Sequence, residues 1–345
     1  MVSMKDVAQR AKVSVSTVSA VINGLDCVRP ATRERVLDAV SELGYVLNHS
    51  ARGLASRKSM NVGLVSMLYQ PNQQDPTANA AVGELSYYPF INKIVECFEN
   101  KDYGILLENF SYMPNSDALP TIVEQNRVDG VFVLGSLYAE AFIAQLKQRL
   151  NAVVAVGCTS VLTDYVQSDY AESIQMSVNY LVARGHRRIA YACGDSLTSA
   201  YPYKLQGYMD GLAKAGIPLD ASLLFPSLYS LNAGYAIGQK ICALPESVRP
   251  TALVCASDVL AAGAYRHFIE SGLRIPKDIS VIGYETIAIG GYLTPALTTV
   301  DWHKDRMGRE ASRIMLERLK NPTLKTQRAV VPCSILERDS VATLE

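Results

Sequence analysis

Short side chains near the start of the chain have the types and spacing needed to contact DNA bases. Residues 4–11 and 15–22 carry apolar stripes at helical spacing, and residues 12–14 separate them as a turn, with a serine placed to cap the second helix. Small side chains cover the other face of the second segment, as in a helix-turn-helix whose second helix enters the major groove. An ordinary helical hairpin is the alternative structure. The candidate DNA contacts in this segment are Ser14, Val15, Ser16, Thr17, Ser19, Ala20 and Asn23.

A third helix and a basic segment follow. Pro30 opens a helix that continues to Leu43, and Gly44 ends it. Residues 48–59 are polar and basic, so they form either a flexible linker or a segment that folds when it meets DNA. Leu54 is an apolar side chain among small and basic neighbours, which suits a wedge inserted between base pairs in the minor groove. The candidate DNA contacts here are Asn48, Ala51, Arg52 and Leu54.

The charge distribution supports a nucleic-acid partner for the first part of the chain. Residues 1–60 contain nine lysines and arginines against five aspartates and glutamates, a net charge of +4. The whole chain has 33 of each kind, so the remaining 285 residues have a net charge of −4. A basic head attracts the phosphate backbone, although a small surplus of this size also occurs on ordinary solvated surfaces.

Several function classes find no support in the sequence. We find no HExxH, GxSxG or phosphate-loop motif, and the four histidines lack metal-ligand spacing, so we expect neither an enzyme nor a cofactor. Seven scattered cysteines predict reduced thiols in the cytoplasm. No apolar run is long enough to cross a membrane, and the first residues do not resemble a secretion signal.

From residue 61 onward, short apolar strands alternate with amphipathic helices. This pattern predicts two lobes, each a parallel sheet with helices on both faces, so the expected fold class is an all-α helix-turn-helix head plus a two-lobe α/β domain. Ligands bind beyond the carboxyl ends of strands in such sheets, which places a site between the lobes. The expected strands are 61–68, 104–108, 130–134 and 152–156 in the first lobe, and 165–167, 188–192, 222–225, 253–255 and 279–282 in the second.

Several blocks of residues make a family resemblance specific. They are the head and hinge described above, Val166-Gln167-Ser168-Asp169, Arg184-Gly185-His186, Ala256-Ser257-Asp258 and Gly283-Tyr284-Glu285. With these blocks the chain resembles the lactose-repressor and galactose-repressor family of bacterial transcription regulators. The resemblance implies a homodimer on a palindromic operator, with the Leu54 side chains inserted at its centre, and an effector domain similar to periplasmic sugar-binding proteins.

The resemblance also implies a domain organisation with three passages of the chain between the lobes. The expected parts are a helix-turn-helix domain at 1–47, a hinge at 48–60, and an effector-binding and dimerisation domain at 61–345, with an N-lobe of 61–160 and 291–320 and a C-lobe of 161–290 and 321–345. The polar segment 70–88 is expected to form a loop that serves as a lid or as a dimer contact.

The chain departs from the family pattern at positions that the resemblance assigns to recognition. Ala20 replaces a common arginine in the second helix, which puts the base preference at one half-site position in doubt. Lys204 replaces an arginine, Glu285 an aspartate and Ser257 an asparagine, whereas Asp258 is retained. Since lysine lacks the rigid two-pronged geometry of arginine, we expect a polar ligand unlike the common ones of the family. Binding of a common sugar in spite of these changes is the alternative.

The candidate effector contacts combine these polar positions with aromatic residues that offer flat faces to a sugar or a base. They are Tyr88, Phe90, Asp169, Tyr203, Lys204, Ser257, Asp258 and Glu285. The sequence therefore predicts a DNA-binding repressor controlled by a small polar ligand, a sugar or a sugar derivative. A solute-binding receptor of a transport system is the alternative, and the sequence leaves open whether the ligand is an inducer or a corepressor.

Overall fold

The chain folds into two compact units, Met1–Ser59 and Met60–Glu345. The computed structural model describes residues 2–22, 26–45, 58–68, 77–111, 116–135 and 140–344. We call the first unit the head and the second the body, and each is described by itself. No helix within these ranges is long and apolar enough to cross a membrane.

The head contains three helices around a small apolar core. The helices are α1 (Met4–Ala11), α2 (Val15–Ile22) and α3 (Pro30–Leu43). Val7, Val18 and Val36, one from each helix, are completely buried. Helix α3 ends at Gly44, which adopts the left-handed conformation (φ 59°) that glycine reaches without steric cost. The helix-turn-helix and the limits of the third helix are therefore confirmed.

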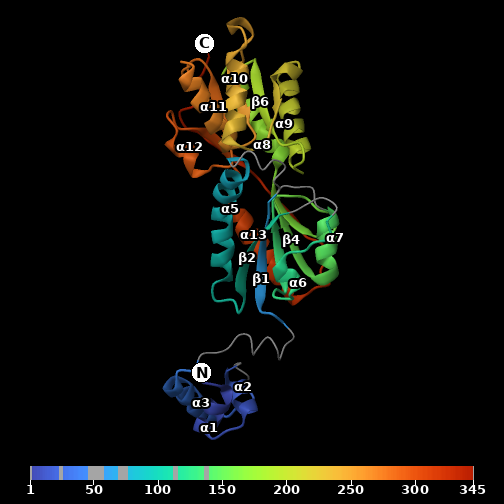
Figure 1. Cartoon of the computed structure of the whole chain (residues 1–345), viewed down its shortest axis with the longest axis vertical. Helices are drawn as coiled ribbons and strands as arrows, with labels where there is room; N and C mark the ends of the chain where they lie inside the picture. Colours follow the sequence, from blue (N-terminus) through green and yellow to red (C-terminus); the bar gives the residue numbers. More distant parts are fainter. Residues whose placement is uncertain are drawn as a thin grey trace. The chain divides into compact units, whose positions relative to one another are not determined.

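The body contains two six-stranded sheets, one in each lobe (Figure 1). The first sheet is parallel throughout, and the second is parallel except for β12, which pairs antiparallel with β10. In spatial order the first sheet contains β11 (Arg328–Val331), β5 (Asp164–Ser168), β4 (Ala152–Val156), β3 (Gly130–Leu134), β1 (Asn61–Leu68) and β2 (Gly104–Ser111). The second contains β12 (Ser334–Leu336), β10 (Thr298–Asp301), β9 (Ser280–Tyr284), β8 (Ala252–Cys255), β6 (Ile189–Gly194) and β7 (Leu224–Pro226).

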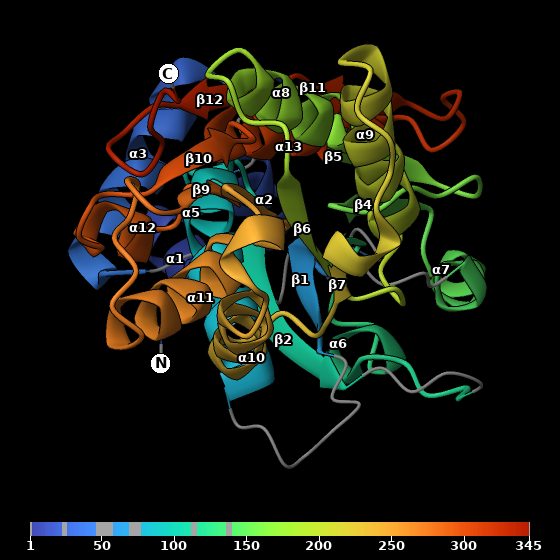
Figure 2. The same ribbon diagram turned by 90° about the horizontal axis from the view of Figure 1, so that it is seen from above.

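Helices cover both faces of each sheet, as the alternation of strands and helices predicts. In the second lobe, α8 and α9 lie on one face and α10 and α11 on the other (Figure 2), with a separate apolar cluster under each pair. In the first lobe, α5 and α13 pack on one face, and α6 and α7 on the other. Their bounds are α5 (Thr77–Phe98), α6 (Thr121–Glu124), α7 (Glu140–Arg149), α8 (Tyr170–Val182), α9 (Tyr201–Lys214), α10 (Leu231–Cys242), α11 (Asp258–Glu270), α12 (Ala288–Tyr292) and α13 (Lys304–Lys320).

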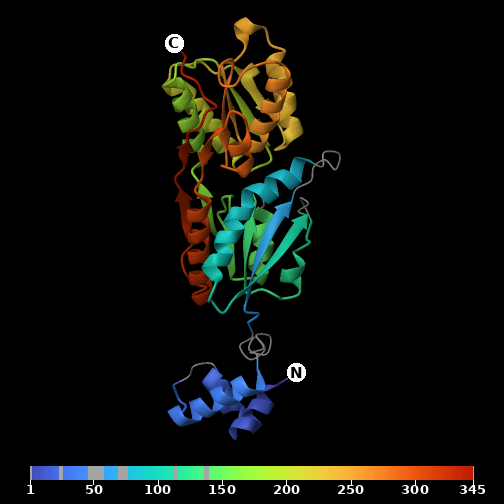
Figure 3. The same ribbon diagram turned by 90° about the vertical axis from the view of Figure 1, so that its left-hand side faces the viewer.

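The chain passes between the lobes three times, as predicted, but at different residues. Strand β5 pairs with β4 in the first sheet, whereas the sequence analysis placed it in the second lobe. Strand β10 pairs with β9 in the second sheet and β11 returns to the first, so these two strands were assigned to the wrong lobes, whereas α13 and β12 lie in the lobes predicted for them. Figure 3 shows these late strands, in orange to red, at the junction of the lobes. The passages follow β5, β10 and β11, and the local apolar pattern of the sequence does not reveal which sheet each of these strands joins.

Helix α5 begins much earlier than expected. The polar segment 70–88 was expected to form a loop, whereas α5 starts at Thr77 and contains Pro89 in its interior. Pro89 lies in the interior of the helix, where proline cannot donate a backbone hydrogen bond. Residues 69–76 lie outside the described residues.

Close approach of α10 and α11 depends on glycines without side chains. A β-carbon at Gly263 would collide with the carbonyl oxygen of Leu231, and one at Gly234 would collide with that of Leu260. We expect Gly263→Ala to lower the free energy of unfolding by about 1–3 kcal/mol, because the helices must separate. Urea denaturation checks this, with Gly291→Ala as the control, where the added carbon meets only the Arg338 guanidinium at 3.9 Å. Equal stability of the two variants would contradict the expectation.

Candidate DNA-binding and effector sites

The candidate DNA-binding surface lies on α2 of the head. The Thr17 backbone N–H donates to the Ser14 hydroxyl over 3.1 Å, which confirms Ser14 as the helix cap. The same hydroxyl lies 2.7 Å from that of Ser16 and 2.8 Å from that of Thr17. Val15 is exposed although it is apolar, while Val18 on the opposite face is buried. The start of α2 therefore presents an open surface of short side chains, as a helix that enters a groove requires.

The remaining predicted DNA contacts divide into two groups. Ser19 and Ala20 are half-buried on α2. The others lie outside the described residues, so the structure does not place them: Asn23, Asn48, Ala51, Arg52 and Leu54.

Lys204 is the buried cation at the centre of the candidate effector site. Only 4 % of it is exposed, although it lies on the first turn of α9. Its Nζ donates to the carbonyl oxygen of Ala256 over 2.9 Å and lies 3.8 Å from the ring centroid of Tyr284. The rings of Tyr170 and Tyr229 lie 5.6 Å and 5.8 Å away. Burial lowers the pKa of Lys204 to about 8, and the carboxylate of Glu285 opposes this change.

Glu285 follows β9 in an unusual backbone conformation. Its φ is 109°, a region that residues with a β-carbon rarely adopt, and the next residue, Thr286, has a φ of 53°. Backbone bonds hold it: its N–H donates to Val300 O over 3.0 Å, and its carbonyl oxygen accepts the Trp302 indole N–H over 3.1 Å. The carboxylate acts on the pKa of Lys204 from the second lobe and on that of Tyr87, on α5 of the first lobe. Glu285 thus faces groups from both lobes.

Aromatic residues connect the two lobes around this charge pair. The Tyr170 hydroxyl at the start of α8 donates to Gly157 O over 2.7 Å, and the hydroxyls of Tyr284 and Ser168 are 2.8 Å apart. Tyr87 packs edge-on against Trp302 with 6.1 Å between ring centroids. A ligand that altered these contacts would change the position of one lobe relative to the other.

Three polar residues predicted to contact the effector also have structural partners, and their contact with an effector stays a prediction. The Ser257 hydroxyl caps α11 by accepting the Leu260 N–H, and the Asp169 carboxylate caps α8 in the same way. Asp258 is fully buried, and its two carboxylate oxygens accept hydrogen bonds from the Ile287 N–H (2.9 Å) and the Thr299 hydroxyl (2.6 Å). Burial raises the pKa of Asp258 to about 7. Asp258 therefore positions the backbone next to Glu285.

The structure does not bring the other predicted aromatic contacts to the charge pair. Phe90 packs in the core of the first lobe with only 1 % exposed, which gives no support to its assignment as an effector contact. Tyr88, next to it on α5, is 62 % exposed, and Tyr203 on α9 is 45 % exposed. Their contact with an effector remains a prediction.

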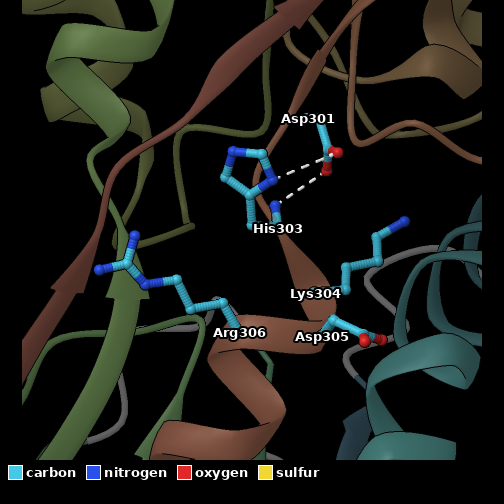
Figure 4. A pocket seen from close by; sticks show the side chains of 5 residues that line it. All are labelled: Asp301, His303, Lys304, Asp305 and Arg306. Atoms are coloured by element: carbon cyan, nitrogen blue, oxygen red, sulfur yellow. Dashed lines mark hydrogen bonds and ion pairs between the residues drawn. The ribbon is translucent and has the colours of Figure 1, made fainter.

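Lys304, the first residue of α13, belongs to the site but was missed. It is buried, its Nζ has no hydrogen-bond acceptor among the residues that the structure describes, and burial lowers its pKa. It lines a cavity of about 470 Å³ at the second passage between the lobes, together with Asp301, His303, Asp305 and Arg306 (Figure 4). A lysine at a helix N-terminus interacts unfavourably with the helix dipole. This unfavourable placement is the sequence feature that could have identified Lys304.

Redox and metal chemistry receive no support from the described parts of the chain. They contain no group of three or more histidine, cysteine, aspartate or glutamate side chains that could hold a metal ion. The seven cysteines are free thiols; Cys158, Cys193 and Cys255 are buried, and Cys27 is exposed. The arrangement is suited to recognition of a ligand by charge, hydrogen bonds and aromatic faces.

Comparison with known proteins agrees with this geometry. Residues 3–48 match the family described as bacterial regulatory proteins, lacI family, and residues 178–341 match a periplasmic binding protein-like domain. The HTH-type transcriptional repressor PurR of Erwinia tasmaniensis is 34 % identical over 351 residues, which cover 99 % of this chain and 97 % of that protein. PurR of Escherichia coli O1:K1 is also 34 % identical, with the same coverage.

Two solved structures share the fold over nearly the whole chain. The complex of the transcriptional regulator CelR with cellobiose matches with a TM-score of 0.69 and 27 % identity, covering 99 % of this chain and 100 % of that one. The lac repressor dimer bound to operator and the anti-inducer ONPF matches with a TM-score of 0.81 and 24 % identity, covering 99 % of both chains. The chain therefore belongs to the lacI family of bacterial transcriptional regulators, with a periplasmic-binding-protein-like effector domain.

Proposed function

We propose that the protein is a cytoplasmic repressor that binds a palindromic operator as a homodimer and responds to a sugar or a sugar derivative bound between its lobes. The observation that carries the proposal is the buried Lys204 ammonium, which lies 3.8 Å from the Tyr284 ring centroid and interacts electrostatically with the Glu285 carboxylate. Such a pair supplies both a donor and an acceptor to hydroxyl groups, and tyrosine faces suit a sugar ring. The names of the PurR relatives support repression, and the CelR–cellobiose complex supports a carbohydrate.

Ligand control follows from the contacts between the lobes. A ligand that binds Lys204 and Glu285 in the second lobe and Tyr87 in the first favours one relative position of the lobes over another. Such couplings typically change the affinity for a second ligand by about 1–3 kcal/mol. The contacts between the lobes are compatible with a decrease or an increase of DNA affinity. The ligand therefore either releases the protein from DNA or strengthens its binding to DNA.

In vitro selection of random double-stranded DNA by the full-length protein tests the DNA-binding part of the proposal. A palindromic consensus supports a dimeric regulator. The selection is repeated in the presence of a mixture of sugars and sugar derivatives. A protein that needs a corepressor enriches sequences only when the corepressor is present. The absence of enrichment in both experiments would overturn the proposal.

Calorimetric titration with a sugar panel tests the effector part. We expect Lys204→Met to abolish binding of any sugar that the wild type binds, because the ammonium provides the donor at the centre of the site. Lys277→Met is the matched control, since this lysine is exposed on the second lobe. Tight binding of an unmodified common hexose would contradict the expectation that Lys204 and Glu285 select an uncommon ligand.

Ala20 provides a test of the recognition helix. We expect Ala20→Arg to create a preference for guanine at one position in each half-site, because arginine donates two hydrogen bonds to the O6 and N7 atoms of guanine. Comparing the selected consensus sequences of the variant and the wild type measures this. Identical consensus sequences would show that Ala20 does not face a base.

A further inference from the structure

The ammonium group of Lys304 is a buried cation that has no hydrogen-bond partner in the part of the chain that the structure describes. The residue is 8 % exposed, and its Nζ has no hydrogen-bond acceptor within the described residues. Its nearest aromatic neighbour is the Trp302 ring, with the centroid 5.5 Å from Nζ. Because an ammonium group has three N–H donors, leaving all of them unbonded in a buried place is costly.

The acidic groups near Lys304 are engaged elsewhere. Both carboxylate oxygens of Asp258 accept bonds from Ile287 and Thr299. Asp301 accepts the backbone N–H of His303 over 2.8 Å, and its second oxygen lies 3.4 Å from the His303 ring. The charge of Glu285 acts on the pKa of Lys304 and also on that of Lys204, so one carboxylate influences two buried lysines.

The cavity wall around Lys304 carries balanced charges, with Asp301 and Asp305 as well as Lys304 and Arg306. Asp305 pairs with Lys93 at 3.3 Å and with Arg309 at 3.6 Å, which balances its own charge. The preceding residue, His303, makes no side-chain cap on α13, so the positive end of this 17-residue helix is not satisfied by a side-chain cap. Figure 4 shows Lys304 and Arg306 extending in opposite directions from the first turn of α13.

We propose that Lys304 binds an anionic group of the effector, a carboxylate or a phosphate, while the hydroxyl groups of the same molecule bind Glu285. The effector is then an acidic sugar derivative, either a sugar acid or a sugar phosphate. Opposite charges at Glu285 and Lys304 fix the orientation of such a molecule. Since Lys304 opens a helix of the first lobe and Lys204 lies in the second, the ligand bridges the lobes. This inference rests on the proposed function, because it names the ligand class of the same site.

Thermal unfolding of the full-length protein tests the anion site without knowledge of the effector. Inorganic phosphate and sodium acetate are the probes, each added at constant ionic strength adjusted with sodium chloride. We expect both Lys304→Met and anion binding to raise the melting temperature by about 2 °C or more, because each removes an unpaired buried charge. Phosphate or acetate then stabilises the wild type but not the variant. Lys320→Met is the control, because this lysine lies at the exposed end of the same helix, and it should respond to anions like the wild type.

Each outcome decides the proposal. Stabilisation by phosphate alone indicates a phosphate ester, and stabilisation by acetate indicates a carboxylate. Glucose 6-phosphate and glucuronate, compared with glucose, then extend the same assay to sugars. An equal anion response of the wild type and Lys304→Met, no response of either, or a lower melting temperature of Lys304→Met in every buffer would overturn it. The thermal-unfolding assay does not involve DNA. A failure of the anion site is therefore distinguishable from a failure of the operator selection that tests the proposed function.

Discussion

Replacing Arg318 with methionine is expected to lower the free energy of unfolding of the body by about 3–5 kcal/mol. The Arg318 guanidinium forms a two-pronged pair with the Asp164 carboxylate, with both N–O distances 2.8 Å, and both side chains are at least nine-tenths buried. Arg318 also donates to the carbonyl oxygens of Pro322, Leu324 and Lys325. The variant leaves the Asp164 charge buried and unpaired, and it frees the segment that leads from α13 into β11.

Urea denaturation measures the loss, and a surface arginine on the same helix is the control. Arg313 pairs with Glu310 and Glu317 but is 44 % exposed, so Arg313→Met should cost only about 0–1 kcal/mol. Adding Asp164→Leu to Arg318→Met should restore part of the stability, because no charge is then left unpaired. Similar losses for Arg318→Met and Arg313→Met would show that the buried pair has no special role.

Asp258→Asn is expected to change how stability depends on pH. Burial raises the pKa of Asp258 from 3.8 to about 7, so the folded protein holds this carboxyl protonated over a range in which the unfolded chain ionises it. As pH rises from about 4 to about 7, the free energy of unfolding of the wild type falls by up to about 4 kcal/mol relative to a protein whose residue 258 does not titrate. Below and above this range the contribution is constant.

The asparagine variant isolates this effect because its side chain preserves the hydrogen bonds. The amide oxygen accepts the Ile287 N–H, and the amide N–H₂ donates to the Thr299 hydroxyl. The difference in free energy of unfolding between variant and wild type should therefore increase in favour of asparagine from pH 4 to pH 7. Urea denaturation across this range measures it, and a constant difference would mean that Asp258 has an ordinary pKa in the folded protein.

Local signals in the sequence predicted the head and many elements of the body. The Ser14 cap and the Gly44 stop depend on bonds within one turn of helix, so the residues alone reveal them. Strands β1, β3 and β4 match the expected bounds for the same reason, since each is a continuous apolar run between turns.

Features that depend on distant partners were not predictable in this way. Strand β5 belongs to the first lobe because Asp164 meets Arg318, which lies 154 positions later. Asp258 was assigned to the effector site by the family resemblance, and only the structure shows that its oxygens accept hydrogen bonds from Ile287 and Thr299. Lys304 is the opposite case. Its Nζ lacks a hydrogen-bond acceptor among the described residues, and only the folded structure reveals this.

The three passages between the lobes also impose an order on biosynthesis. The core of the head lies within the first 59 residues, so the head can fold while most of the chain is still to be made. The first sheet is incomplete until β11 is synthesised, and the second until β12 follows at Ser334–Leu336. A chain cut before these strands would therefore retain the DNA-binding head but lack a finished effector site. Premature termination would produce a folded head joined to an incomplete body.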